Sequence, residues 1–325
     1  MRALTREEFD RLREGAARFL GTETVPMVIP GEAILGIEGL ARCAAGPGRR
    51  FVNLVNGPYG RDFGNWLREC GSEVTDVTVP WEEAVSPAAV RAALGRVRPD
   101  GLAYVYAEAV TGGANPAEEI QRAARKFGVY TIVDAVSSVG ADPFRMDEWG
   151  VDFVSMGMQK ALLGSNGISF LGISRRGMDW LRANPAAPRH SLLALPECFD
   201  RQQEAVPPEL SVLEARETLR ACERIEVLGG IEALVQRHQR TAAEVRRRVR
   251  ELGLTLFMAR EEDCTALNTT VRLPDTEAAR RFVRRGIVAC GDGELCGQLL
   301  RINHYGEQCT EEAVQEALGI LKELL

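Results

Sequence analysis

Short apolar runs alternate with amphipathic stretches over the first 175 residues, and this alternation restricts the fold more than any other feature of the chain. The apolar runs fall at residues 51–55, 74–79, 102–106, 130–133, 153–156 and 168–173. Amphipathic stretches at residues 87–94 and 116–127 read as helices between such runs. Strands that alternate with helices in this way build parallel sheets whose two faces are covered by helices. The pattern predicts an α/β domain with a mostly parallel sheet.

The pattern changes after about residue 208. Residues 208–252 are charged and helical in character, with a break at Gly229 and Gly230. Beyond them we expect short strands at residues 254–258, 267–273, 287–289 and 299–302, with helices at residues 275–285 and 310–325. A chain of 325 residues also exceeds what one simple core usually holds. We therefore expect a large domain at residues 1–235, which opens with a helix over residues 5–20, and a small C-terminal α+β domain at residues 236–325.

Charge and composition exclude several classes of partner. The formal net charge is -6 and the pI is near 5.4, with arginines scattered among acids, so we expect no nucleic-acid partner. The first residues lack the apolar core of a signal peptide and no apolar run approaches the length of a membrane span, so we expect a cytoplasmic protein with no membrane partner. The eight cysteines include no Cys-x-x-Cys pair and the three histidines lie far apart, so we expect no metal site.

Two charged residues follow neighbouring strands of the predicted sheet. Asp134 ends the run at residues 130–133, and Lys160 follows the next run, at residues 153–156. A carboxylate at the end of a buried strand is costly unless its charge has a partner. Ligands of open α/β sheets bind beyond the carboxyl ends of the strands, where both side chains would lie.

Pyridoxal chemistry requires such a pair. A lysine amine forms a Schiff base with the aldehyde, and an aspartate keeps the pyridine nitrogen protonated so that the ring can accept electrons. Burial would lower the pKa of Lys160, which could then move a proton between substrate and cofactor carbons. On spacing alone, the alternative is an ordinary aspartate at a strand end and a surface lysine.

Three motifs carry a family resemblance. They are Asp134-Ala135-Val136-Ser137-Ser138, Asp147-Glu148-Trp149-Gly150-Val151-Asp152 and Gly157-x-Gln159-Lys160-Ala161-Leu162. From about residue 7 to its end, the chain resembles the class V pyridoxal-phosphate-dependent aminotransferases of the alanine-glyoxylate or serine-pyruvate type. The resemblance implies fold type I of the PLP-dependent transferases and a homodimer with active sites at its interface. It also implies pyridoxal 5′-phosphate as cofactor, Lys160 as the catalytic residue, and Asp134, Ser137 and Gln159 as cofactor-binding residues.

Two loops extend the resemblance. Asn56-Gly57-Pro58-Tyr59-Gly60 is similar to the turn whose aromatic side chain stacks on the pyridine ring, which implies that role for Tyr59. Glu108-x-x-Thr111-Gly112-x-x-Asn115-Pro116 is similar to the loop that places a hydroxyl beside the ring substituents, which implies a cofactor contact for Thr111. A core tyrosine and a simple turn are the alternatives for these two residues.

A third segment bears on substrate binding. Leu300-Arg301-Ile302-Asn303-His304-Tyr305-Gly306 is similar to the family segment whose arginine binds the substrate carboxylate. A planar guanidinium suits a bidentate pair with a carboxylate, and an arginine within an apolar strand otherwise lacks a reason. We therefore expect Arg301 to bind substrate and His304 to be a structural histidine.

The stretch that matches the family's phosphate-binding turn departs from the usual composition. It reads Ile29-Pro30-Gly31-Glu32-Ala33-Ile34-Leu35-Gly36, and the resemblance implies Gly31, Glu32 and Ala33 as cofactor-binding residues. A helix N-terminus favours a phosphate, but the Glu32 carboxylate would repel one unless the side chain turns outward. Val206 stands where the family usually has a threonine that reaches the phosphate, which also favours weak phosphate binding.

A Gly-Glu pair at this turn is typical of one branch of the family, the pyridoxamine-pyruvate transaminases, which use unphosphorylated vitamin B6 as a substrate. Residues 59–66 and 182–191 resemble the same branch. Ala109 and Asp292 depart from it, because the branch has a threonine and an arginine there. The chain also begins close to Glu7, without the N-terminal segment that usually helps to close the site, so we expect a substrate specificity of its own.

These features together predict an aminotransferase that moves an amino group between an amine or amino-acid donor and a small α-keto acid, pyruvate or glyoxylate, through a Lys160 Schiff base. One alternative is a pyridoxamine-pyruvate transaminase, in which unphosphorylated pyridoxal is a substrate. Another is different PLP-dependent chemistry on the same fold, such as that of a lyase, decarboxylase or racemase. The last is a non-catalytic B6-binding protein.

Overall fold

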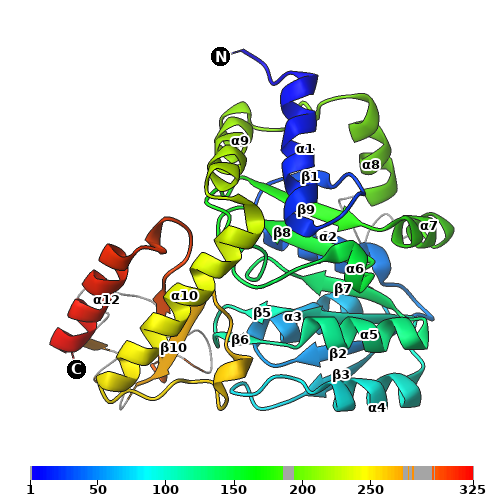
Figure 1. The fold of residues 1–325 in the computed structure, drawn as a ribbon. Helices are drawn as coiled ribbons and strands as arrows, with labels where there is room; N and C mark the ends of the chain where they lie inside the picture. Colours follow the sequence, from blue (N-terminus) through cyan, green and yellow to red (C-terminus); the bar gives the residue numbers. More distant parts are fainter. Residues whose placement is uncertain are drawn as a thin grey trace.

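A computed structural model of the chain describes residues 2–185, 194–273 and 297–324, together with Glu277, Arg280, Arg281 and Leu295. A seven-stranded sheet lies at the centre of the larger part (Figure 1), in the order β1-β9-β8-β7-β4-β2-β3. Its strands are β1 (Met27–Pro30), β2 (Arg50–Val55), β3 (Glu73–Thr78), β4 (Gly101–Val105), β7 (Tyr130–Asp134), β8 (Phe153–Gly157) and β9 (Ile168–Ile173). Only β9 runs opposite to its neighbours in this sheet. The predicted mostly parallel sheet is therefore confirmed, whereas β1 was not foreseen.

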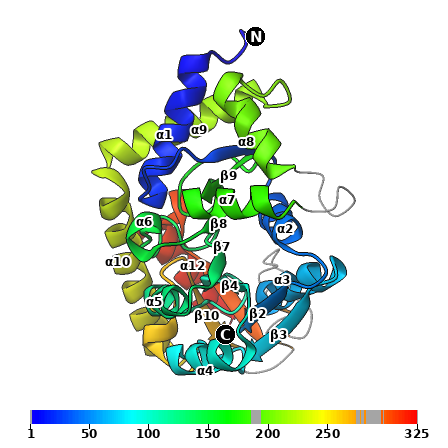
Figure 2. The same cartoon turned by 90° about the vertical axis from the view of Figure 1, so that its right-hand side faces the viewer.

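Helices cover both faces of the sheet (Figure 2). Alternate residues of β2 enter two different apolar clusters, because successive side chains of a strand point to opposite faces. Val52 and Leu54 pack in one cluster and Phe51 in the other. The first cluster includes side chains of α1 (Arg6–Leu20), α4 (Pro87–Val97), α5 (Ala117–Phe127), α6 (Met146–Trp149) and α9 (Val212–Val227). The second includes side chains of α2 (Ala33–Ala44), α3 (Pro58–Glu69), α7 (Arg175–Ala183) and α8 (Leu195–Glu204).

Local sequence signals set the ends of several helices. Helix α1 begins with a capping box, in which the Thr5 hydroxyl accepts from the Glu8 backbone and the Glu8 carboxylate accepts from the Thr5 backbone. It ends at Gly21, whose φ of 64° is the left-handed conformation that terminates helices. Helix α4 begins at a serine cap followed by Pro87, the arrangement expected of a helix start. The predicted N-terminal helix and the two predicted inter-strand helices are confirmed within a few residues.

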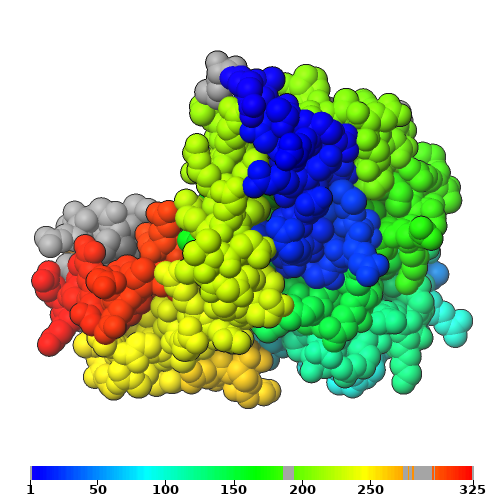
Figure 3. All heavy atoms as spheres, turned by 45° about the horizontal axis from the view of Figure 1, so that its top comes forward, coloured from blue at the N-terminus to red at the C-terminus, as the bar shows by residue number. Residues whose placement is uncertain are grey.

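The C-terminal part has its own apolar cluster. Helix α10 (Gly230–Glu251) leads from α9 to this part and packs on β10 (Asn268–Arg272) and α12 (Glu311–Leu324). Strand β10 pairs antiparallel with β11 (Leu299–Asn303). The cluster combines side chains of α10, both strands and α12. Figure 3 shows this C-terminal part, orange to red, standing at one side of the larger body. The residue 235/236 boundary falls inside α10, which spans both parts.

Some sequence expectations for the C-terminal part fail or fall outside the described residues. The strand predicted at residues 254–258 is wrong, because only Leu256 forms a bridge, to Val271. Its apolar side chains instead fill two side-chain clusters. The strand predicted at residues 287–289 and most of the helix predicted at residues 275–285 lie outside the described residues. Gly229, with a φ of 101°, separates α9 from α10, as its sequence predicted.

No helix among the described residues is both long and apolar enough to cross a membrane.

Candidate active site

Charged side chains from distant parts of the chain gather beyond the carboxyl ends of the parallel strands. Asp134 ends β7, and Lys160 follows β8 by three residues. Burial and the charge of Arg301 lower the pKa of Lys160, while Asp134, Glu32 and Glu108 oppose that shift. Residues 128 positions apart, Glu32 and Lys160, are therefore close enough to interact electrostatically. Of the sequence-predicted site residues, Glu32, Tyr59, Asp134, Lys160 and Arg301 therefore lie within electrostatic range in one place.

Asp134 is nearly enclosed, with 6% of its surface exposed. Its Oδ1 accepts a hydrogen bond of 2.9 Å from the backbone N–H of Val136. Burial raises the pKa of Asp134 to about 6, and the Val136 N–H and the Lys160 charge limit the rise. A carboxylate in this setting is stabilised by a nearby cation, such as a protonated ring nitrogen.

Lys160 lies against a turn from the C-terminal part. Its Nζ is 5.8 Å from the centre of the Tyr305 ring, within the range of a cation–π contact. Gly306 has a φ of 63°, and a Cβ added there would lie 3.0 Å from the Lys160 carbonyl oxygen. The Gly306 N–H donates to His238 Nε2 over 3.2 Å, which ties this turn to α10. The turn fixes the backbone that carries Lys160.

Tyr59 lies in the first turn of α3, with 38% of its surface exposed. Burial raises the pKa of its hydroxyl, and the charges of Glu108 and Asp134 add to the rise. Its backbone N–H donates to Glu108 Oε2 over 3.0 Å. The ring therefore stands at the rim of the same site, where a planar ligand could stack on it.

Thr111 is completely buried. Its hydroxyl accepts a hydrogen bond of 3.3 Å from the Gly113 backbone. This contact supports the simple-turn alternative, and a cofactor contact for Thr111 stays a prediction. Ser137, 8% exposed, lies three residues after Asp134 and likewise keeps its predicted role untested.

The Gln159 side chain folds back toward the start of α2. A Cβ on Gly157 would overlap the Gln159 Oε1 and lie 3.0 Å from the Ala33 Cβ. The start of α2 is tied to β8, since the Ser155 hydroxyl donates to the Ala33 carbonyl over 3.2 Å. Both amide atoms of Gln159 are buried without a hydrogen-bond partner among the described residues. A buried amide of this kind is costly unless a ligand satisfies it.

Glu32 occupies the N-cap position of α2, but its side chain is exposed and makes no capping hydrogen bond. Gly31 before it has a φ of 126°, and a Cβ there would meet the Leu35 side chain at 2.7 Å. The free N–H groups of α2 and the Glu32 carboxylate thus lie at the same turn. A phosphate here gains from the helix terminus and is repelled by the carboxylate.

The C-terminal part contributes one polar face of its two-stranded sheet. Thr270 pairs with Arg301 and Asn268 pairs with Asn303, so these side chains share a face. The Ala109 carbonyl accepts from Asn268 Nδ2 over 2.7 Å and from Arg301 Nη1 over 3.4 Å. Four buried atoms on this face lack a partner among the described residues: Asn268 Oδ1, Thr270 Oγ1, Arg301 Nε and Asn303 Oδ1.

His304 lies on the opposite face, 1% exposed, with Nε2 2.9 Å from the Thr269 hydroxyl. Burial lowers its pKa to about 3. This environment agrees with the structural role predicted for His304.

Val206 is partly buried against the main apolar cluster. Asp292 lies outside the described residues. So do residues 186–191 of the branch-like segment at residues 182–191.

Sequence reasoning gave no role to Glu108, although the motif that begins with it was recognised. Tyr305 and the partners of Arg301 were also missed. The alternation of side chains along β11 was the available signal for Asn303, two residues after Arg301. For Glu108 no signal existed, because the contact that links it to the site is with backbone groups of α3, a separate element.

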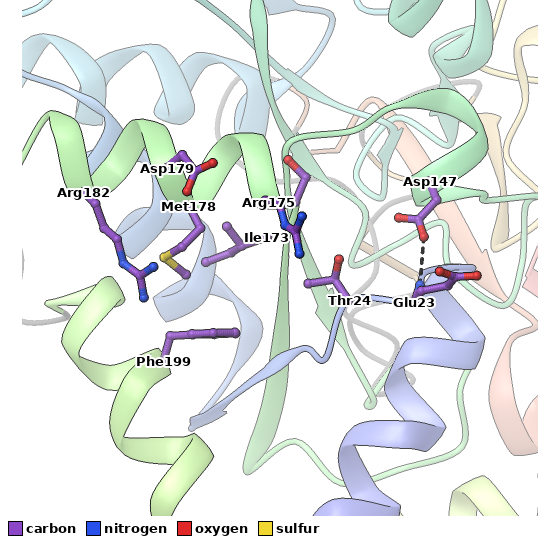
Figure 4. A pocket seen from close by; sticks show the side chains of 10 residues that line it. Glu23, Thr24, Asp147, Ile173, Arg175, Met178, Asp179, Arg182 and Phe199 are labelled. Carbon is purple, nitrogen blue, oxygen red and sulfur yellow. Dashed lines mark hydrogen bonds between the residues drawn. The ribbon is translucent and has the colours of Figure 1, made fainter.

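A pocket of about 590 Å³ lies at the opposite edge of the sheet (Figure 4). Ile173, which lines this pocket, pairs with Phe153 at the start of β8. Lys160 instead follows the end of β8. The pocket's charges are largely satisfied: the Asp147 carboxylate accepts from the Glu23 backbone over 2.8 Å, and Arg182 pairs with Asp200 at 2.6 Å. The pocket is therefore separate from the Lys160 site.

The sequence model of the family described as Aminotransferase class-V matches residues 65–311. A pyridoxamine–pyruvate transaminase from Mesorhizobium japonicum is 30% identical over 92% of this chain and 78% of its own length. An alanine–glyoxylate aminotransferase from Drosophila melanogaster is 26% identical over 97% of this chain and 83% of its own length.

Solved structures give the same picture. The alanine–glyoxylate aminotransferase of Nostoc sp. superimposes with a TM-score of 0.89 at 26% identity, covering 98% of this chain and 86% of its own. The pyridoxamine-pyruvate aminotransferase of Mesorhizobium loti also has a TM-score of 0.89, at 27% identity, covering 99% of this chain and 87% of its own. The described residues therefore have the architecture of these enzymes.

Proposed function

Because the chain belongs to the class V aminotransferase family, whose cofactor is pyridoxal 5′-phosphate, we propose that it transfers an amino group from an amine or amino acid to a small α-keto acid, pyruvate or glyoxylate. The observation that carries the proposal is the Lys160 amine, partly buried beside Asp134 and Arg301 with a lowered pKa. An amine that loses its proton more easily than an ordinary lysine is suited to carbonyl and proton-transfer chemistry.

The residues present fit the ring of the cofactor. The Gln159 amide, buried and without a partner among the described residues, supports a ligand group at this point. Tyr59 offers an aromatic face and Asp134 a buried carboxylate for the ring nitrogen. When bound, pyridoxal 5′-phosphate supplies an aldehyde for the amino group and a ring that accepts electrons from the substrate α-carbon.

The chain's own residues do the rest. The Lys160 Nζ would take the proton from the donor's α-carbon, because its lowered pKa leaves the amine unprotonated more often than that of an ordinary lysine. The Asp134 carboxylate would favour positive charge on the ring nitrogen of the bound group. The Arg301 guanidinium, held at Nη1 by the Ala109 carbonyl, keeps Nε free for a carboxylate oxygen of the keto acid.

Single-turnover chemistry tests this function. The purified protein is mixed with L-alanine, and keto acid is measured together with the absorbance change of the bound cofactor. One keto acid per site, abolished in Lys160→Ala, is the expected result. Release of ammonia or carbon dioxide instead would point to the lyase or decarboxylase alternative, and no reaction with any amine would favour a non-catalytic B6-binding protein.

The Glu32 carboxylate favours a second candidate, a pyridoxamine-pyruvate transaminase for which unphosphorylated vitamin B6 is a substrate. Glu32 is the N-cap residue of α2, at the turn that the family resemblance assigns to the phosphate, and a hydroxymethyl group could donate to it without repulsion. The relative from Mesorhizobium japonicum carries that activity in its name. Turnover of free pyridoxamine with pyruvate, and a protein purified without phosphate on its Lys160 adduct, would favour this candidate. Retention of the phosphate adduct through turnover would exclude it.

We further propose a cytoplasmic homodimer with the site at its interface, and the division of the chain into domains at residues 1–235 and 236–325. The separate apolar cluster of the C-terminal part supports that division. Exposure of Tyr59 at the rim of the site is consistent with cover from a second copy. Sedimentation equilibrium of the purified chain tests the oligomeric state.

A further inference from the structure

We propose that Glu108 is a positioning residue of the ring site: its uncharged carboxyl group fixes the first turn of α3, and with it Tyr59, while Asp134 carries the negative charge beside Lys160. The inference rests on the proposed function, because it concerns the ring that Tyr59 would stack against. Glu108 belongs to none of the roles assigned above.

Glu108 reaches across from a different element to hold α3. It lies in the short strand β5 (Ala107–Glu108), just beyond the end of β4, and is completely buried. Its Oε2 accepts from the Tyr59 N–H over 3.0 Å, its Oε1 accepts from the Val110 N–H over 3.5 Å, and the Gly60 N–H also contributes. One carboxyl group thus joins the β5 turn to the turn that carries Tyr59.

Helix α3 receives no capping hydrogen bond from the side chain of its own N-cap residue. Gly57, at the capping position, cannot supply a side-chain oxygen, and the first backbone N–H groups of a helix need an acceptor. Glu108 supplies it from outside the helix. Loss of this acceptor would leave the Tyr59 and Gly60 amides unsatisfied in a buried setting and release the first turn.

The space at Gly57 is reserved for the same side chain. A Cβ on Gly57 would overlap the Cγ, Cδ and Oε2 of Glu108. The φ of Gly57 is 174°, an extended conformation open to any residue, so steric room and not backbone conformation requires the glycine. The fit between Gly57 and Glu108 shows that the carboxyl group is packed into a defined position.

The charge state follows from the groups that face Glu108. These are Asp134 on β7, Tyr59 on α3 and Lys160 after β8. Burial, and then repulsion from Asp134, raise the pKa of Glu108 to about 8 against the opposing effect of the Val110, Gly60 and Tyr59 N–H groups, whereas the Val136 N–H and Lys160 hold that of Asp134 to about 6. Near pH 7 the proton therefore leaves Asp134 first and stays on Glu108.

The test compares Glu108→Gln and Glu108→Ala with a matched control, Asp142→Asn. Asp142 is another buried carboxyl whose pKa is raised to about 6, and it accepts from Thr265 and Ala266, not from the turn that carries Tyr59. Four quantities are measured for each protein: the Kd for pyridoxal 5′-phosphate by fluorescence, the visible circular dichroism of the bound chromophore, its absorbance between pH 6 and 9, and the melting temperature.

At pH 7 Glu108→Gln is expected to match the wild type in Kd and circular dichroism, because the amide keeps an acceptor oxygen and lacks charge. Above pH 8 the chromophore of the wild type shifts as Glu108 ionises, and this shift is absent from Glu108→Gln. Glu108→Ala is expected to bind the cofactor roughly tenfold more weakly, with reduced circular dichroism, since about one hydrogen bond is lost from Tyr59. Asp142→Asn lowers the melting temperature alone.

Two results would overturn the proposal. A folded Glu108→Gln that no longer holds the cofactor would mean that the charge, not the acceptor, is needed. A Glu108→Ala that behaves like Asp142→Asn would reduce Glu108 to a structural residue. If Glu108→Ala does not fold, Glu108→Asp, whose shorter side chain cannot reach Tyr59, replaces it with the same expectation. A wild type without a Lys160-dependent chromophore would refute the proposed function itself, which separates the two failures.

Discussion

The two walls of the site differ in how their polar groups are satisfied. On the wall from the large part, Asp134 and Glu108 both accept hydrogen bonds from backbone N–H groups. On the wall from the C-terminal part, Asn268, Thr270, Arg301 and Asn303 keep buried atoms that have no partner in the described residues. The two carboxyl groups of the first wall are satisfied within the protein, although its Gln159 amide has no partner among the described residues, whereas four residues of the second wall keep groups left for a ligand.

This difference suggests a division of labour. Groups already fixed by the backbone cost no reorganisation when a ring binds, which is how an enzyme stabilises developing charge. Groups without partners are costly until a ligand arrives, and so they tie the binding free energy to the identity of that ligand. We expect substitutions on the first wall to lower the rate of the chemical step and those on the second to change substrate affinity.

Asp134→Asn should have the largest effect on the first wall. The amide cannot hold a positive charge on the ring nitrogen, and loss of one electrostatic contact of this kind typically costs about 10²–10³-fold in kcat. Stopped-flow measurement of the half-reaction with L-alanine gives the rate constant of the chemical step, and steady-state turnover with pyruvate gives kcat and KM. An unchanged kcat with a raised KM would place Asp134 in binding only and remove the contrast between the walls.

Arg301→Lys should change the second wall. Lysine keeps the charge but loses the planar fork, so the KM for pyruvate should rise about 10–100-fold while kcat falls less. The charge of Arg301 also lowers the pKa of Lys160, so Arg301→Gln should raise that pKa, seen as an alkaline shift in the pH profile of Lys160 labelling. A fall in kcat alone, with KM unchanged, would contradict a role in binding.

His304→Asn probes the layer behind the second wall. The folded-state pKa of His304 is about 3, so the neutral ring is favoured and its stabilisation is present above pH 6.5 and lost as the pH falls toward 3. At pH 5 the free energy of unfolding of the wild type should be roughly 2 kcal/mol lower through this group than above pH 6.5, at about 1.4 kcal/mol per pKa unit. The gap in unfolding free energy between wild type and variant should therefore narrow from pH 7 to pH 5 in urea titrations. A constant gap would show that His304 does not titrate in this range.

Asn268→Ala should have the smallest effect and the most specific one. It removes the 2.7 Å hydrogen bond to the Ala109 carbonyl, which also accepts from Arg301. We expect the free energy that holds Arg301 in position to fall by about 1 kcal/mol, which should appear as a few-fold rise in the KM for pyruvate. Thr269→Val, on the opposite face of β10, serves as control and should leave KM unchanged. Equal effects of both would mean that the strand as a whole, not its polar face, sets the KM.

The sequence predicted most of the sheet because strands buried on both faces are apolar along their whole length. It did not predict β1, which has only four residues, nor the reversed direction of β9, because apolar composition carries no direction. The strand expected at residues 254–258 failed because Leu256, Phe257 and Met258 are apolar for side-chain packing and not for a hydrogen-bonded ladder.

Within the site, Asp134 and Lys160 could be predicted because each follows a strand that the pattern reveals. Glu108 could not, because its partners are backbone N–H groups of α3 that only the fold brings within reach. For the same reason, the shared contact of Asn268 and Arg301 with the Ala109 carbonyl leaves no mark on the sequence.

The overlap between Gly57 and Glu108 constrains how this site could change over generations. Any side chain at residue 57 collides with the carboxyl group, and shortening residue 108 without filling the space leaves a void and two orphaned amides. Each single change is therefore harmful on its own, and a variant of this turn becomes reachable only when both positions change together. The pair should behave as one inherited unit, so that in any collection of related chains a residue larger than glycine at position 57 should occur with a smaller residue at position 108.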